Sequence, residues 1–135
     1  MKRVFVLTMA AIVLLLCCSC TQYEPLIVPG HSEFEETLKG EYDYISGIKC
    51  VREDPYTYSV RCRIAKRIEQ EDMSSVIEAL KDYALTSALE AYKVEYERDP
   101  DTIFLNFYVN SNTRIYFRYR YELTSCESPT WEFES

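Results

Sequence analysis

Few side chains in this 135-residue sequence could perform acid–base or nucleophilic chemistry. His31 is the single histidine, and any Ser-His-Asp or Cys-His arrangement would have to use it. Because it follows Pro29-Gly30, we expect it in an exposed loop. Acidic side chains that could form a hydrolytic pair all lie near expected element ends, where carboxylates commonly cap helices and form turns. They are Glu69, Glu71, Asp72, Asp99 and Asp101, and we predict no catalytic residue.

Three cysteines, Cys50, Cys62 and Cys126, follow the N-terminal region. Cys50 and Cys62 are expected on one face of a β-hairpin, so a disulfide between them is one prediction. Two small buried thiols are the alternative. Because the three cysteines show no C-x-x-C spacing, a zinc site that also used His31 is not expected, and we predict no metal or other cofactor.

Arginine and aromatic side chains alternate with apolar ones in "TIFLNFYVNSNTRIYFRYRYEL", residues 102–123. The alternation predicts a β-hairpin whose apolar residues face the core, with a turn at 111–113. In that register Tyr108 lies opposite Tyr116, and Phe104 lies opposite Arg120. Aromatic and cation–π pairs across strands stabilise a sheet by about 0.2–1 kcal/mol each, so a purely structural role is the alternative to ligand binding.

A second hairpin is predicted from "EYDYISGIKCVREDPYTYSVRCRIAKRI", residues 41–68, where two β-rich runs flank Asp54-Pro55. We expect Cys50 opposite Cys62 and Ile48 opposite Ile64 on the core face, which Val60 shares. The outward face would then carry Ile45, Lys49, Val51, Arg61 and Arg63.

The two outward faces together suggest a recognition surface. Arginine binds anionic groups through its planar fork and stacks on aromatic rings, and tyrosine adds a rigid ring with a polar tip. The predicted surface consists of Arg61, Arg63, Tyr108, Arg114, Tyr116, Arg118 and Arg120.

Two helices are predicted to complete the domain. The first covers residues 32–39, with Ser32 and Glu35 as a capping box and Gly40 at its end. The second begins after Asp72, carries an apolar stripe from Met73 to Val94 and stops at Asp99-Pro100. A second stripe of Leu85, Leu89, Tyr92 and Tyr96 is expected either beneath Trp131 and Phe133 of the C-terminal tail or in a partner-binding groove.

The predicted fold class is therefore α+β, with two antiparallel β-hairpins bracketing one long α-helix that packs on one sheet face. Residues 1–19 read as a signal peptide, 20–30 as an extended tether and 31–135 as a single domain. The last residues, 124–135, are expected as an irregular tail or an edge strand.

The N-terminus has the charge order of a secretory signal. Lys2 and Arg3 precede an apolar run at 4–16, which is shorter than the roughly 20 residues that a membrane-spanning helix needs. The run ends in "LLLCCSC" rather than in a small-residue cleavage site.

This segment resembles the signal of bacterial lipoproteins, in which a Leu-rich run ends in a lipobox whose cysteine receives fatty acyl chains such as palmitate. Cys20, preceded by Ser19, fits best, and Cys18 is the alternative. The resemblance implies a domain anchored stably to a membrane by several acyl chains. Thr21 after the cysteine implies the outer membrane, by the sorting rule of enteric bacteria.

Composition excludes some functions. Loss of Lys2 and Arg3 with the signal would move the formal charge from −7 to −9, which argues against general nucleic-acid binding and against direct attraction to anionic lipid. Three glycines in the whole chain leave no phosphate-binding glycine loop.

The sequence thus predicts a non-enzymatic envelope lipoprotein that binds an acidic protein or an anionic envelope glycan through its basic, aromatic sheet face. An inhibitor or accessory subunit of a cationic secreted protein is the first alternative, and a carboxylate-dependent hydrolase is the second.

The lipid attachment is directly testable. We expect Cys20→Ala to abolish labelling by a fatty-acid analogue and to release the domain into the soluble fraction. Labelling that is lost only in Cys18→Ala would move the attachment site, and labelling that survives both changes would contradict the lipoprotein assignment.

Overall fold

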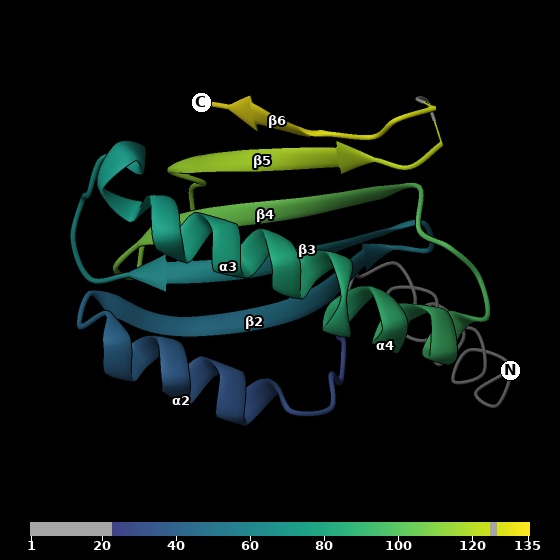
Figure 1. The fold of residues 1–135 in the computed structure, drawn as a ribbon, viewed down its shortest axis with the longest axis horizontal. Coiled ribbons are helices and arrows are strands. Elements are labelled where there is room, and N and C mark those ends of the chain that lie inside the picture. The colour runs from purple at the N-terminus through teal and green to yellow at the C-terminus, as the bar shows by residue number, and fades with distance from the viewer. Residues whose placement is uncertain (1–22, 125–126) are drawn as a thin grey trace, which may run out of the picture.

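The computed structural model describes residues 23–124 and 127–135, which form one six-stranded sheet with helices on one face (Figure 1). The α+β class is therefore confirmed. The strands lie in the sheet in sequence order: β1 (Glu24–Pro25), β2 (Ile45–Asp54), β3 (Thr57–Ile64), β4 (Thr102–Val109), β5 (Phe117–Glu122) and β6 (Trp131–Glu134). The helices are α2 (His31–Glu41), the short 3₁₀ helix η1 (Gln70–Met73), α3 (Ser74–Leu85) and α4 (Ser87–Tyr96).

The arrangement of two hairpins around a helix is not what the structure shows. Strands β2 and β3 pair antiparallel, as do β4 and β5, but β3 and β4 also pair side by side and parallel, with Val60 opposite Leu105. The hairpins therefore share one sheet. Because parallel neighbours need a long crossover, η1, α3 and α4 form the connection between β3 and β4.

The predicted long helix is broken near its middle. Thr86, with φ −114° and ψ −88°, separates α3 from α4. Beyond the break the predicted apolar stripe continues to Ala88, which is fully buried, but it does not reach the end of α4. Tyr92, from the second stripe, is fully buried, whereas Val94 is 75% exposed.

The first helix is longer than predicted and begins differently. Gly30 precedes it with φ 79°, a left-handed conformation that glycine adopts at little cost, and no side chain caps the helix. Glu35 does not close a capping box, because its Oε2 accepts a hydrogen bond from the backbone N–H of Ile48 at 2.7 Å. Gly40 lies inside the helix, which ends at Glu41.

The predicted register of β2 and β3 is wrong by two residues. Cys50 lies opposite Val60, and Cys62 lies opposite Ile48. One irregularity, between Arg52 and Asp54, shifts the pairing next to the turn. A second irregularity, between Ile45 and Gly47, turns Ile45 into the core, although it is expected outside. Cys50 and Cys62 share the core face as predicted but sit on a diagonal, and both are buried free thiols in this structure.

The register of β4 and β5 is confirmed, with Phe104 opposite Arg120. Strand β5 begins only at Phe117, so the connection is longer than the predicted turn. Strand β6, in the segment expected as a tail or an edge strand, pairs with β5 and places Glu134 opposite Arg118 and Glu132 opposite Arg120.

The segment expected as a tether is partly attached to the domain. Strand β1 pairs with β2, the Leu26 N–H donates to the Cys50 carbonyl at 2.9 Å, and Leu26 and Val28 are buried. Cys18, Cys20 and Cys126 lie outside the described residues. Among the residues that the structure describes, no helix combines the length and apolar character that crossing a membrane requires.

The state of the two core thiols can be tested chemically. Burial raises the pKa of Cys50 and of Cys62 to about 12, so both stay protonated and unreactive at pH 8 in the folded protein. We expect iodoacetamide to modify neither residue in native protein and both residues after unfolding in urea without reductant, as read by peptide mass spectrometry. A disulfide-linked pair of peptides would instead support the alternative bridge.

Candidate functional site

The parallel strands β3 and β4 have their carboxyl ends side by side at one end of the sheet. Ile64 pairs with Val109 there, and β2 begins beside them with Ile45 opposite Ile64. The carboxyl ends of parallel strands are a frequent place for ligand binding, because loops and strand ends leave a crevice. Two cavities have lining residues at this end of the sheet.

The first cavity, of about 280 Å³, opens on the sheet face that points away from the helices. We call it the cationic cleft. Lys49 is exposed and has no ion-pair partner within the described residues. None of the described side chains that line the cleft is acidic. Its lining residues are Ser46, Gly47, Lys49, Arg61, Arg63 and Tyr108.

Arg61 is held in place from two directions. Its Nη2 lies 3.2 Å from Oε1 of Glu53, and its guanidinium lies 4.6 Å from the centre of the Tyr23 ring. The carboxylate offsets the charge of Arg61 and fixes its orientation. Arg61 therefore forms a rigid wall of the cleft rather than its strongest source of positive potential.

Arg63 keeps an uncompensated charge. It donates to the backbone carbonyls of Asn110 and Asn112, the latter at 3.1 Å, and its guanidinium lies 5.3 Å from the centre of the Tyr108 ring. Carbonyl oxygens satisfy its hydrogen bonds but carry no formal charge, so Arg63 and Lys49 supply the net positive charge of the cleft. Tyr108 is buried beneath both arginines.

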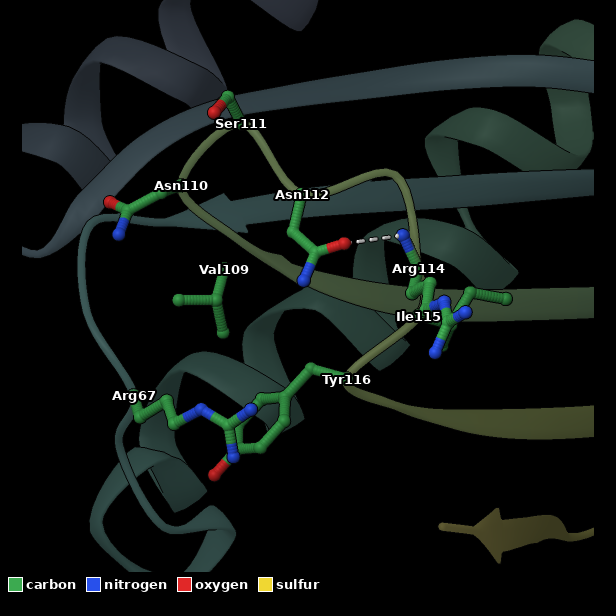
Figure 2. A pocket seen from close by; sticks show the side chains of 8 residues that line it. All are labelled: Arg67, Val109, Asn110, Ser111, Asn112, Arg114, Ile115 and Tyr116. Atoms are coloured by element: carbon green, nitrogen blue, oxygen red, sulfur yellow. Dashed lines mark hydrogen bonds between the residues drawn. The ribbon is translucent and has the colours of Figure 1, made fainter.

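The second cavity, of about 660 Å³, is formed by the loop between β4 and β5 (Figure 2). We call it the loop pocket. The Asn112 side chain accepts a hydrogen bond from the Arg114 backbone N–H at 2.9 Å and shapes the loop. Tyr116 donates to the Ile68 carbonyl at 3.3 Å, and the Arg67 guanidinium lies 5.4 Å from the centre of its ring. Neither Arg67 nor Arg114 has an ion-pair partner in the described part of the chain.

Arg118 and Arg120 belong to a charge network with β6 rather than to an open basic face. Arg118 Nε lies 2.7 Å from Oε2 of Glu134, and its guanidinium stacks 4.5 Å from the centre of the Phe104 ring. Arg120 lies within 3.4 Å of carboxylate oxygens of Glu122, Glu132 and Glu134. The hydrogen bond to Glu132 and the charge of Glu134 raise the pKa of Arg120.

The structure thus divides the seven residues predicted for the recognition surface into three groups. Arg61, Arg63 and Tyr108 meet in the cationic cleft, Arg114 and Tyr116 line the loop pocket, and Arg118 and Arg120 face β6. Lys49 was predicted to point outward but was not included among the site residues. The sequence contained one signal for the ion-pair network of β5 and β6. The two glutamates of "WEFE" at 131–134 have the same spacing as the two arginines of "FRYR" at 117–120.

One polar side chain at the centre of this face is not fully paired. Asn106 is 1% exposed, and its Oδ1 has no hydrogen-bond partner among the described residues. It lies opposite Arg61 on β3 and opposite Arg118 on β5. Both arginines are engaged with glutamates, Glu53 and Glu134, which leaves the amide oxygen without a donor.

His31 lies at the start of α2 in a partly buried chain of hydrogen bonds rather than in an exposed loop. Its Nδ1 lies 2.6 Å from the Tyr83 hydroxyl, and its Nε2 lies 2.9 Å from the Ile48 carbonyl. The carbonyl can only accept, so Nε2 carries the proton, Tyr83 donates to Nδ1, and the Cys50 thiol donates to the Tyr83 oxygen at 3.7 Å. The arrangement does not create a nucleophile, because burial raises the pKa of Cys50 to about 12.

The described residues offer little support for metal-dependent chemistry. Within them, no cluster of three or more histidine, cysteine or acidic side chains is placed to hold a metal ion. Comparison with protein-family models, with curated proteins and with solved structures finds no match for this chain. Its function is therefore inferred from the geometry and charge of the described residues.

The pairing of β5 with β6 predicts a charge-swap result. We expect Arg118→Glu to destabilise the protein by about 0.2–1 kcal/mol, because it places two carboxylates opposite each other in the sheet. Adding Glu134→Arg restores an opposite-charge pair and should recover part of that loss in urea unfolding. If the double variant is as unstable as the sum of the two single variants, the two side chains are not coupled.

Proposed function

We propose that this protein is a membrane-anchored envelope lipoprotein that binds an anionic ligand through the cationic cleft and performs no catalysis. The lipid attachment comes from the N-terminal sequence, and the binding role comes from the cleft. The single observation that carries the binding role is the presence of Lys49 and Arg63, two uncompensated cations, in one cavity without a lining acid.

The charge of the cleft stands out against an acidic protein. The whole chain has a formal charge of −7, so general electrostatics repel an anion from most of the surface. A local pair of cations beside a buried aromatic ring creates a specific attraction at one place. Electrostatic patches of this kind set partner choice and association rate more than raw affinity.

The geometry suits binding better than chemistry. Arg61 and Arg63 are oriented by Glu53 and by backbone carbonyls, so they lose little side-chain freedom when a ligand arrives. The lining residues include no histidine, carboxylate or thiol that could act as a general base or nucleophile. The cleft therefore offers preorganised donors for an oxyanion and nothing that would transform it.

Charge reversal at Lys49 tests the proposal. In detergent-solubilised mature protein, we expect Lys49→Glu to weaken binding of dextran sulfate, a polyanionic glycan, by about tenfold, which is about 1.4 kcal/mol. Replacing one of two uncompensated cations with an anion turns an attraction into a repulsion. Raising the salt concentration to 1 M should weaken wild-type binding as the Debye length falls to about 3 Å.

Lys39→Glu is the matched control. Lys39 is exposed in the last turn of α2, away from the cleft, and its substitution changes the net charge by the same amount. Polyglutamate in a parallel titration represents an acidic protein. Equal weakening by both substitutions would mean that only net charge matters, and no weakening by Lys49→Glu would refute the cleft as the binding site.

A further inference from the structure

The position of Tyr23 limits how far the domain can move from its lipid anchor. Two residues, Thr21 and Gln22, separate the proposed lipidated Cys20 from Tyr23, and the three residue-to-residue steps between them span at most about 10–11 Å. From Tyr23 onward the chain is held by the domain, because Tyr23 packs on Arg61 and Glu24 forms an ion pair with Arg52 at 3.1 Å. The anchor thus begins within a short distance of the sheet.

The first described residue, Tyr23, lies on a particular face of the domain. Arg61 points away from the helices, and the Tyr23 ring stacks on its guanidinium. The cationic cleft opens on that same face, with Arg61 forming part of both contacts. The short distance from Cys20 to Tyr23 therefore allows a membrane that holds Cys20 to reach the outer face of the sheet, close to the cleft.

The side chains around this exit suit a lipid surface. Tyr23 is 58% exposed, and tyrosine favours the boundary between headgroups and acyl chains. Lys49, Arg61 and Arg63 outnumber their one acidic partner, Glu53, on the half of the face formed by β2 and β3. The half formed by β5 and β6 is slightly acidic, because Arg118 and Arg120 face three glutamates. The cationic half is therefore the one that an anionic surface would attract.

We propose that the outer face of β2 and β3 lies against the membrane that carries the lipid anchor, and that the cationic cleft binds the phosphate of an anionic lipid headgroup in that membrane. This inference rests on the proposed function, both for the acylation of Cys20 and for anion binding by the cleft. Arginine and lysine side chains bind phosphate oxygens through charge-assisted hydrogen bonds. The anchor supplies the second attachment that such a weak contact needs, because it keeps the cleft close to the membrane, where the local concentration of headgroups is high.

The test uses acylated wild-type protein reconstituted in vesicles of phosphatidylcholine alone or mixed with phosphatidylglycerol. A water-soluble amine-acetylating reagent is added, and modification of each lysine is followed by mass spectrometry. We expect Lys49 to react about fivefold more slowly in the phosphatidylglycerol vesicles than in phosphatidylcholine vesicles, because headgroups cover it. Lys39, on a helix at the opposite side of the sheet, is the internal control and should react at the same rate in both.

Salt separates headgroup contact from burial by the anchor. At 1 M salt the acylated protein stays on the vesicle, but the electrostatic contact is screened, so Lys49 should regain its reactivity. Soluble glycerol phosphate added to protein in detergent should leave Lys49 reactive, because it lacks the local concentration of a tethered headgroup. Protection by glycerol phosphate would identify a free phosphate as the ligand and overturn the membrane contact.

The remaining outcomes distinguish this inference from the proposed function. Equal reactivity of Lys49 in both vesicle types overturns the headgroup contact. If Lys49→Glu still weakens dextran sulfate binding in that case, the cleft binds a glycan and the proposed function stands. If the purified protein carries no fatty acid, the lipoprotein assignment and this inference both fail, because no anchor holds the cleft at a membrane.

Discussion

The parallel pairing of β3 with β4 is the constraint on which the rest of the structure depends. It joins two antiparallel hairpins into one sheet and requires η1, α3 and α4 to cross from one end of the sheet to the other. The crossover places the helices on one face, where Val60 and Leu105 are completely buried. It also aligns Arg63 with Tyr108 at the carboxyl ends of the two strands, which no hairpin alone would bring together.

The other face of the sheet has no helical layer in the described structure, and its polar side chains are divided by charge. Next to β6, Arg118 and Arg120 are matched by glutamates directly opposite them. Next to β2, Lys49 and Arg63 have no such partner, although Arg61 is paired with Glu53. Long side chains cover the strands with their aliphatic stems and keep their charged ends near solvent. One face can thus contain both a stabilising ion-pair network and a cleft that attracts anions.

The sequence predicts local features of this fold better than distant ones. The faces of Cys50, Cys62 and Phe107 follow from strand alternation, and the register of β4 with β5 follows from that alternation across a nearby turn. The predicted register of β2 with β3 is wrong because the pairing contains bulges, and the alternation of apolar and polar residues does not reveal them. The parallel pairing of β3 with β4 and the position of β6 depend on contacts between distant segments. Periodicity therefore could not predict that the seven proposed recognition residues lie in three separate groups.

Contacts on the helix face hold the helices on the sheet and leave the other face free for binding. Three core tyrosines use their hydroxyls to bind atoms of other segments: Tyr58 donates to the Ala84 carbonyl at 2.5 Å, Tyr92 donates to the Pro55 carbonyl at 2.8 Å, and Tyr83 bonds His31. Each ring fills apolar space while its hydroxyl pairs with a polar atom of another segment. These contacts fix α2, α3 and α4 against the sheet from one side. The residues of the cationic cleft lie on the opposite side, so their charges can serve binding without being needed to hold the helices in place.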